Sequence, residues 1–154
     1  NVARLGLGLY GINGSPFGPL PVKPVLEMRS VVGSIKTILA GERVGYNGTF
    51  TAQNEMTVAT VPVGYFEGVD RRLSNKGYFK VRGADCPIVG RVSMNITSID
   101  VSAVPQIRLG EEVVVISSNA NDKNSIENMA KTAQTIPWEV LVRIPQHIRR
   151  TVIE

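Results

Sequence analysis

The chain has 154 residues, the length of one ordinary domain that can bury a hydrophobic core without disulfide bonds. It contains one cysteine, Cys86, and one histidine, His147, which excludes an internal disulfide and leaves no His and Cys set for a metal. The net charge is +4, but lysine and arginine are scattered, so we expect a mildly basic surface and no nucleic-acid partner.

The sequence contains no signal for membrane insertion. It opens on no charged and apolar leader, and no apolar run approaches the roughly 18 residues of a membrane span. We therefore expect a soluble protein with no membrane partner. A single cysteine fits a reducing compartment, and we expect the cytoplasm.

The first predicted element is a short buried strand over residues 3–9, within ARLGLGLYG. Both of its faces are apolar and one arginine, Arg4, stands at its head, which is typical of a central strand of a parallel sheet. We expect such a strand to need further strands upstream, outside this sequence. Residues 13–24 are dense in glycine and proline and predict an irregular connector between residues 1–12 and a domain over residues 25–154.

The next hundred residues carry the pattern of β-strands. Alternating and β-branched residues from Val25 to Ile38 predict a long strand bent at Gly33. A second strand is predicted over Met56–Val63. Tyr46 leads into this strand and Tyr65 leaves it, each in a glycine-rich bend whose backbone can approach a ligand closely.

The later elements complete a mostly antiparallel sheet or barrel. Residues 77–81 and 86–92 predict a hairpin across a turn at residues 82–85. Further strands are predicted over residues 96–101 and 112–116, with a turn at residues 109–111 between them.

One helix is predicted near the end of the chain. Ser125 is a suitable N-cap residue, Asn128 stands at the third helical position, and an apolar face follows at helical spacing. That face consists of Ile126, Met129, Ala130 and Ala133. The run after Pro137 is ambiguous between a strand and a short helix.

Several kinds of catalytic site are excluded by missing motifs. The sequence has no GxSxG nucleophile elbow, no phosphate loop with GKS or GKT, and no dinucleotide fingerprint. We therefore predict a packing role for Cys86 and a surface position for His147.

Five motifs, in order over nearly the whole chain, carry a family resemblance. ARLGLGLYG, VGYNGTF, VPVGYFEG, PIVGRVSMN and TIPWEV resemble the alanine racemase versions RxGIxLYG, VSYGxTY, IPxGYADG, PVVGRVxMD and TIPYEI. The resemblance implies the carboxy-terminal β domain of a homodimeric enzyme that interconverts L- and D-alanine. It also implies an amino-terminal (β/α)₈ barrel whose last strand is the one predicted over residues 3–9.

The resemblance implies that the intact protein binds pyridoxal 5′-phosphate (PLP) through a barrel lysine outside this chain. Arg4 matches the arginine that contacts the pyridine nitrogen, and a guanidinium can only donate there. Gly6 and Leu7 match backbone N–H groups that meet the phosphate, and Trp138 stands where the family has a tyrosine that contacts it. These four residues would serve the chain's own barrel.

Four other residues would serve the partner's active site. Tyr46 matches the tyrosine that acts as a base on one face of the substrate, opposite the lysine. Tyr65 and Arg71 match residues of the substrate entrance, and Met94 matches a backbone amide that binds the carboxylate. For Arg71 the alternative is an ordinary solvated charge beside Arg72.

The chain departs from the family motifs at several residues, and these leave two alternatives open. Phe66, Glu67 and Asn95 replace Ala, Asp and Asp, Trp138 replaces Tyr, and the tail PQHIRR differs. Serine racemases of similar architecture exist, so serine is an alternative substrate. The other alternative is a non-catalytic basic β module with a platform of stacked aromatic side chains. Its candidates are Tyr46, Phe50, Tyr65, Phe66, Tyr78 and Phe79.

Overall fold

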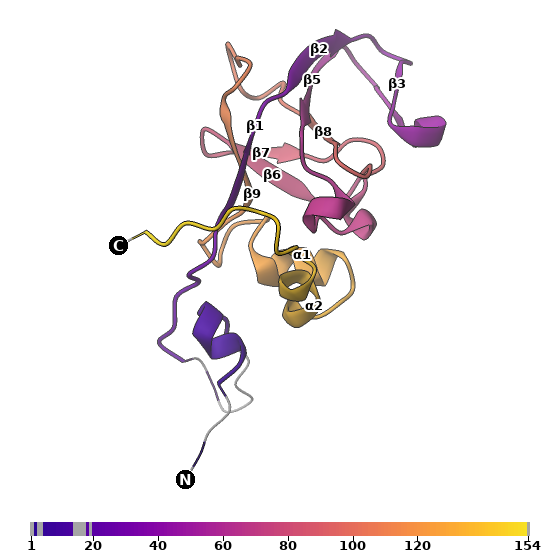
Figure 1. Ribbon diagram of the computed structural model, residues 1–154. Helices are drawn as coiled ribbons and strands as arrows, with labels where there is room; N and C mark the ends of the chain where they lie inside the picture. Colours follow the sequence, from indigo (N-terminus) through magenta and orange to yellow (C-terminus); the bar gives the residue numbers. More distant parts are fainter. Residues whose placement is uncertain (1, 3–4, 14–17, 19, 154) are drawn as a thin grey trace.

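The computed structural model describes residues 2, 5–13, 18 and 20–153, and within them the fold is mainly antiparallel β (Figure 1). A four-stranded sheet has the order β1-β9-β6-β7, a three-stranded sheet the order β2-β5-β8, and β3 pairs with β4. The strands are β1 (Met28–Val31), β2 (Ser34–Ile38), β3 (Arg43–Val44), β4 (Phe50–Thr51), β5 (Met56–Val61), β6 (Tyr78–Val81), β7 (Ala84–Pro87), β8 (Thr97–Asp100) and β9 (Glu112–Ile116). The predicted fold class, a mainly β antiparallel domain with short helices, is confirmed.

The segment from Val25 to Ile38 forms two strands rather than the single strand predicted. β1 pairs with β9, whereas β2 pairs with β5 in the other sheet. The predicted bend at Gly33 is the point of change: Val32 N donates to Glu111 O at 2.8 Å, and Gly33 N donates to Thr60 O at 2.7 Å. Because consecutive N–H groups bond to different neighbours, the chain passes from one sheet to the other here.

The predicted hairpin of β6 and β7 is present with a shorter turn, but its second strand is Ala84–Pro87 and not the predicted residues 86–92. Val81 pairs with Ala84, so only Arg82 and Gly83 connect the strands. Their φ angles are 48° and 79°, the left-handed values of a type I′ turn, whose twist matches that of the flanking strands.

Within the described residues 5–9, the chain does not form the strand predicted over residues 3–9. Arg4 lies outside the described residues, and Leu7–Tyr10 form a 3₁₀ helix, η1. The backbone there bonds locally, with Leu9 N donating to Gly6 O at 3.0 Å and Gly11 N to Gly8 O at 3.1 Å. No described strand runs beside this segment to offer it ladder hydrogen bonds, so the local pattern prevails.

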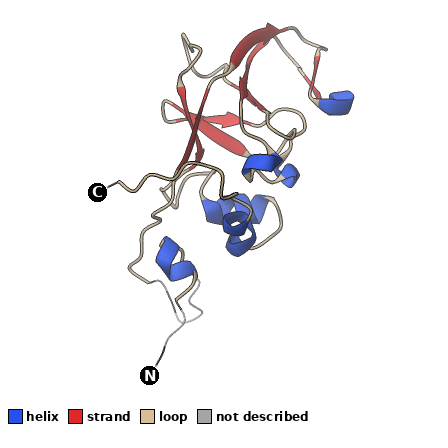
Figure 2. Cartoon of the chain, viewed as in Figure 1, coloured by secondary structure: helices blue, strands red, loops and turns tan. Residues whose placement is uncertain are grey.

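The core lies between the sheets and the two helices, α1 (Ile126–Thr132) and α2 (Pro137–Val142), which cover one end of the strands (Figure 2). Phe79, Ile99 and Val113 are fully buried within it. The predicted apolar face of α1 is confirmed, since all four of its residues are buried. Cys86 is also fully buried, and burial raises the pKa of its thiol to about 11, in agreement with a packing role.

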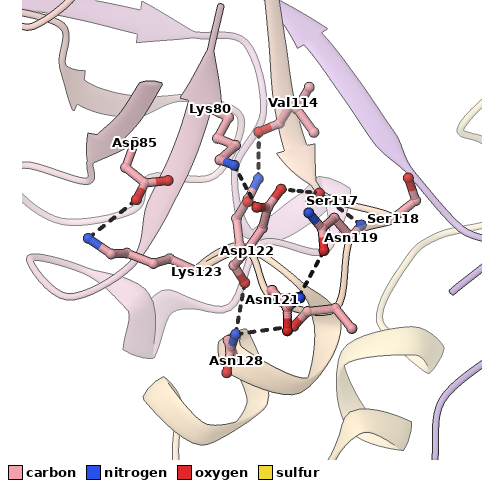
Figure 3. Close-up of polar contacts among 12 residues, drawn as sticks. Lys80, Asp85, Val114, Ser117, Ser118, Asn119, Asn121, Asp122, Lys123 and Asn128 are labelled. Carbon is pink, nitrogen blue, oxygen red and sulfur yellow. Dashed lines mark hydrogen bonds and ion pairs between the residues drawn. The ribbon is translucent and has the colours of Figure 1, made fainter. Parts of the chain in front are cut away.

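The polar loop of residues 117–125 is held by side-chain contacts and leads into α1 (Figure 3). The Asp122 carboxylate accepts hydrogen bonds from Lys80 Nζ and Ser117 Oγ, both at 2.6 Å. Ser125 then caps the helix as predicted, its Oγ accepting from Asn128 N at 3.3 Å. The ambiguous run after Pro137 is helical only as far as Val142, in α2. No helix in the described chain combines the length and apolar character that crossing a membrane requires.

Candidate functional site

Tyr46 lies at the tip of the hairpin formed by β3 and β4 (upper right of Figure 1). It begins a 3₁₀ turn, η2 (Tyr46–Gly48), and its side chain is 67% exposed. Gly45, Asn47 and Gly48 all have positive φ, which lets the chain reverse within a few residues. The fold therefore presents this phenol outward on a tight turn.

A small hydrophobic cluster anchors the base of the Tyr46 hairpin. Its buried members are Ile38, Ala52, Val58 and Val89. Val44 and Phe50, which pair across the hairpin, pack against this cluster. The strands that carry Tyr46 are thus fixed by packing, although they are only two residues long.

Tyr65 and Met94 are brought together by backbone hydrogen bonds. Tyr65 begins the 3₁₀ turn η3 (Tyr65–Glu67), and its N–H donates to Ser93 O at 3.0 Å. Phe66 N donates to Met94 O at 2.9 Å. A Cβ on Gly64 would lie 2.2 Å from Ser93 O, so only glycine permits this approach. The Tyr65 and Met94 side chains are 45% and 53% exposed.

The residues that depart from the racemase motifs are connected to one another beside this pair. Glu67 accepts from Gly64 N and from Asn95 Nδ2, both at 2.7 Å. The ring of Phe66 stacks on His147, with centroids 5.0 Å apart. His147 is exposed, as predicted. Phe66 is therefore turned against the carboxy-terminal tail, while Glu67 and Asn95 form one hydrogen-bonded unit.

Arg71 lies between the two tyrosine segments. It begins the 3₁₀ turn η4 (Arg71–Leu73) and lines a cavity of about 440 Å³ with Tyr65 and Arg143. It also lines a second cavity, of about 370 Å³. The other residues of that second cavity are Thr49, Arg72, Ser74, Asn75 and Arg91. Because Thr49 closes the Tyr46 turn, this second cavity connects that turn to η4. Tyr46, Tyr65, Arg71 and Met94 are together called the Tyr46 group.

A ring of four charged side chains joins η4 to α2, and sequence reasoning missed it. Asp70 is 6% exposed and accepts from Arg72 Nη2 at 2.6 Å and from Arg143 Nη1 at 3.1 Å. Glu139 accepts from Arg143 and forms an ion pair with Arg72, whose Nη2 lies 3.1 Å from its Oε1. Burial alone would raise the pKa of Asp70, but hydrogen bonds from Arg72 and the charges of both arginines outweigh it and lower the pKa. The signal available in the sequence was an Asp in the N-cap position before Arg71.

Trp138 and Gly6 form the second group of site residues. A Cβ on Gly6 would lie 2.4 Å from Trp138 Cζ2, so the indole ring packs directly on the glycine backbone. Within the described chain, the N–H groups of Gly6 and Leu7 donate no backbone hydrogen bond, and Trp138 is 40% exposed. N–H groups with no acceptor in the described part of the chain, beside an aromatic ring, fit one side of a phosphate cradle. The predicted contact of Arg4 lies outside the described residues.

Two other kinds of site find no support in the described residues. Phe79 is fully buried, so the six aromatic residues cannot together form a stacking platform. Tyr78 is covered by Lys123, whose Nζ lies 4.3 Å from the ring centroid. No group of three or more described His, Cys, Asp or Glu residues could hold a metal ion.

The fold and the exposed site residues together define the class of this protein. It is an antiparallel β domain whose candidate site residues lie on its surface. Residues 25–152 match the family model described as the alanine racemase C-terminal domain. The chain belongs to this family.

Individual relatives agree with this assignment. An alanine racemase of Sorangium cellulosum (strain So ce56) is 42% identical over 156 residues, which cover 97% of this chain and 41% of that protein. Among solved structures, the alanine racemase of Bartonella henselae with covalently bound pyridoxal phosphate has a TM-score of 0.85 and 32% identity, covering 96% of this chain and 40% of its own. That of Oenococcus oeni has a TM-score of 0.87 and 26% identity, with coverage of 98% and 42%. The chain thus spans about two fifths of the length of the relatives that it matches.

Proposed function

We propose that this chain is the carboxy-terminal part of a PLP-dependent alanine racemase and supplies Tyr46 as a base to the active site of a homodimer partner. The observation that carries the proposal is the exposed phenol of Tyr46 on a hairpin whose base is anchored by packing, with its closing residue Thr49 in the same cavity as Arg71. The side chains of the Tyr46 group lie on an open surface and do not by themselves enclose an active site. The barrel of the partner subunit would enclose them.

In the intact protein, PLP would be held by Arg4, Gly6, Leu7 and Trp138, which would serve the chain's own barrel. When bound, PLP withdraws electrons from the substrate's α-carbon and makes its proton acidic. The N–H groups of Gly6 and Leu7 would donate to the phosphate, and the packing of Trp138 on Gly6 would exclude water there.

Each residue of the Tyr46 group would have a different role toward the substrate. Tyr46 would move the proton on one face of the α-carbon, and a barrel lysine would act on the other face. The Met94 carbonyl oxygen accepts a hydrogen bond from Phe66 N. The Met94 N–H donates no backbone hydrogen bond in the described chain, so it is free to bind a carboxylate. Arg71 would add a fixed positive charge at the entrance, and Tyr65 would narrow it.

Replacement of Tyr46 by phenylalanine in the intact enzyme tests the proposal. The substitution keeps the ring and removes the proton-transferring hydroxyl, so exchange of the α-proton with solvent should fall by orders of magnitude for one alanine enantiomer and persist for the other. The measurement is deuterium incorporation from D₂O for each enantiomer separately. Tyr65→Phe is the matched control, and it should leave the ratio of the exchange rates of the two enantiomers unchanged. Equal loss for both enantiomers in Tyr46→Phe contradicts the one-sided role.

Serine is a second candidate substrate. The hydrogen-bonded Glu67 and Asn95 lie next to Met94, and a polar pair at this position favours a substrate side chain that carries a hydroxyl. Comparison of kcat/KM for alanine and serine, in the intact enzyme and in Asn95→Asp, decides between them. A preference for serine that Asn95→Asp reduces would support this second candidate.

A further inference from the structure

Asn75 joins three separate segments of the domain through one side chain. It follows η4 with a left-handed backbone at φ 57°. Its Nδ2 donates to Thr49 O at 3.1 Å, and its Oδ1 accepts from Gly90 N at 2.6 Å. Since Thr49 closes the turn that begins at Tyr46, the carboxamide ties that turn to the Gly90 segment and to η4.

The Tyr46 turn and the Gly90 segment touch through their backbones. A Cβ on Gly45 would lie 2.8 Å from Arg91 N, and a Cβ on Gly90 would lie 2.8 Å from Val44 O. Both glycines also have positive φ, at 79° and 81°. The Asn75 carboxamide therefore bridges two surfaces that are already in contact, which leaves little freedom for the turn.

Ser74, the residue before Asn75, fixes η4 against the segment that follows Gly90. Ser74 Oγ donates to Arg71 O at 2.5 Å and accepts from Val92 N at 3.0 Å. η4 is thus tied to the chain just beyond Gly90 independently of Asn75. Asn75 consequently attaches the Tyr46 turn to a segment that is itself held in place.

We propose that Asn75 is a positioning residue for Tyr46: it locks the hairpin tip against Gly90 and Arg91 and so sets where the phenol stands relative to the α-carbon. The inference rests on the proposed role of Tyr46 as a one-sided base. The hydrophobic cluster anchors only the base of this hairpin, and β3 and β4 are two residues long. The orientation of the tip therefore depends on its backbone contact with Gly90 and Arg91 and on the carboxamide that fastens that contact. A displacement of about 1 Å at a reacting group can slow a reaction roughly a hundredfold.

Two substitutions in the intact PLP-loaded enzyme separate positioning from backbone conformation. Asn75→Gly keeps access to the left-handed backbone and removes both hydrogen bonds. Asn75→Asp also tolerates this backbone and keeps an acceptor for Gly90 N, but places a carboxylate where the donor to Thr49 O was. Gln106→Gly is the matched control, because Gln106 is another exposed amide residue with left-handed φ, at 53°, in a different loop.

The readout is exchange of the α-proton with D₂O for each alanine enantiomer, with Tyr46→Phe as reference and thermal melting to establish folding. We expect both Asn75 variants to slow exchange roughly 10- to 100-fold for the enantiomer that Tyr46→Phe affects, and by less than about threefold for the other. Gln106→Gly should leave both rates unchanged. If Asn75→Gly does not fold, Asn75→Asp carries the test.

The role of Asn75 and the role of Tyr46 can fail separately in these measurements. A one-sided loss in Tyr46→Phe together with equal or absent losses in the Asn75 variants overturns the role of Asn75 alone. Equal losses in Tyr46→Phe itself overturn the role of Tyr46 and, with it, the positioning role. A one-sided loss in all three variants supports both.

Discussion

At the scale of single residues, Trp138 is the most informative departure from the racemase motifs. Its ring packs on the backbone of Gly6, where a Cβ would be too close. The indole Nε1–H can donate one hydrogen bond but cannot accept one, whereas a phenol hydroxyl can do both. The residue therefore exchanges a versatile polar contact for a larger packing surface.

We predict that Trp138→Tyr in the intact enzyme binds PLP more tightly, by up to roughly tenfold, or about 1.4 kcal/mol. A phenol can donate a charge-assisted hydrogen bond to the phosphate, and such bonds contribute about 1.5 to 3 kcal/mol. Titration of the apoprotein with PLP measures the effect. Trp138→Phe, which has a ring but no donor, should show no gain. Tighter binding by the tryptophan form would show that the indole is the better phosphate partner.

Asp70 gives a prediction about stability and pH. Its lowered pKa means that the folded state favours the carboxylate, so its contribution is complete above the unfolded pKa near ~3.9 and is lost as pH falls through the folded value. Asp70→Asn should lower the free energy of unfolding by about 1 to 3 kcal/mol at pH 7, because Arg72 and Arg143 lose a charged acceptor. The difference from the wild type should shrink below pH ~4.

Urea denaturation of both proteins at pH 7 and pH 3 measures this difference. Glu55→Gln removes an exposed acid outside the ring and serves as the control, with no expected change at either pH. A difference between Asp70→Asn and the wild type that stays constant with pH would contradict the assignment of stability to the ionised carboxylate.

At the scale of elements, α1 depends on its first residues. It has only seven residues, and a helix of this length is marginal without tertiary contacts and a cap. Ser125 is 2% exposed and supplies the capping oxygen, while Ile126, Met129 and Ala130 supply the buried face. The helix is therefore held by one local and one non-local interaction.

We predict that Ser125→Ala lowers the free energy of unfolding by about 1 kcal/mol, because the partly buried Asn128 N–H loses its acceptor. Ser125→Thr keeps an accepting hydroxyl and should lose less than the alanine variant. Chemical denaturation of the three proteins under one condition measures both effects. An alanine variant as stable as the wild type would show that packing alone maintains this helix.

At the scale of the whole molecule, the two groups of site residues lie on parts of the domain joined by the ring of Asp70, Arg72, Glu139 and Arg143. α2 carries Trp138 and η4 carries Arg71, and the ring bridges these two elements. One domain would therefore hold a cofactor contact for its own barrel and substrate contacts for its partner's barrel in a fixed relation.

We predict that a polypeptide of these 154 residues neither racemises alanine nor traps PLP. Lys36, Lys80 and Lys123 are paired with Glu42, Asp122 and Asp85. The remaining lysines are Lys23, Lys76 and Lys131, and none lies beside the Gly6 and Trp138 group as a described contact. Borohydride treatment after incubation with PLP, followed by peptide mapping, checks this. A modification mapped to one specific lysine would contradict it.

Much of the fold was predictable because its signals are local. β9 covers the predicted residues 112–116, and Ser125 caps α1 with the predicted apolar face buried. The turn of the β6 and β7 hairpin falls within the predicted residues 82–85, since left-handed backbone at Gly83 is a property of the residue itself. The five motifs also assigned the family, which the comparison over residues 25–152 supports.

The sequence by itself determined the strand periodicities, the helix cap, the tight turns and the family, because each depends on residues close together in the chain. Only the tertiary structure decided the division at Gly33, the 3₁₀ helix at Leu7–Tyr10 and the approach of Trp138 to Gly6. It likewise decided the carboxamide bridge at Asn75. These features depend on which distant segment offers a hydrogen-bond partner or a packing surface, and local propensity carries no information about that choice.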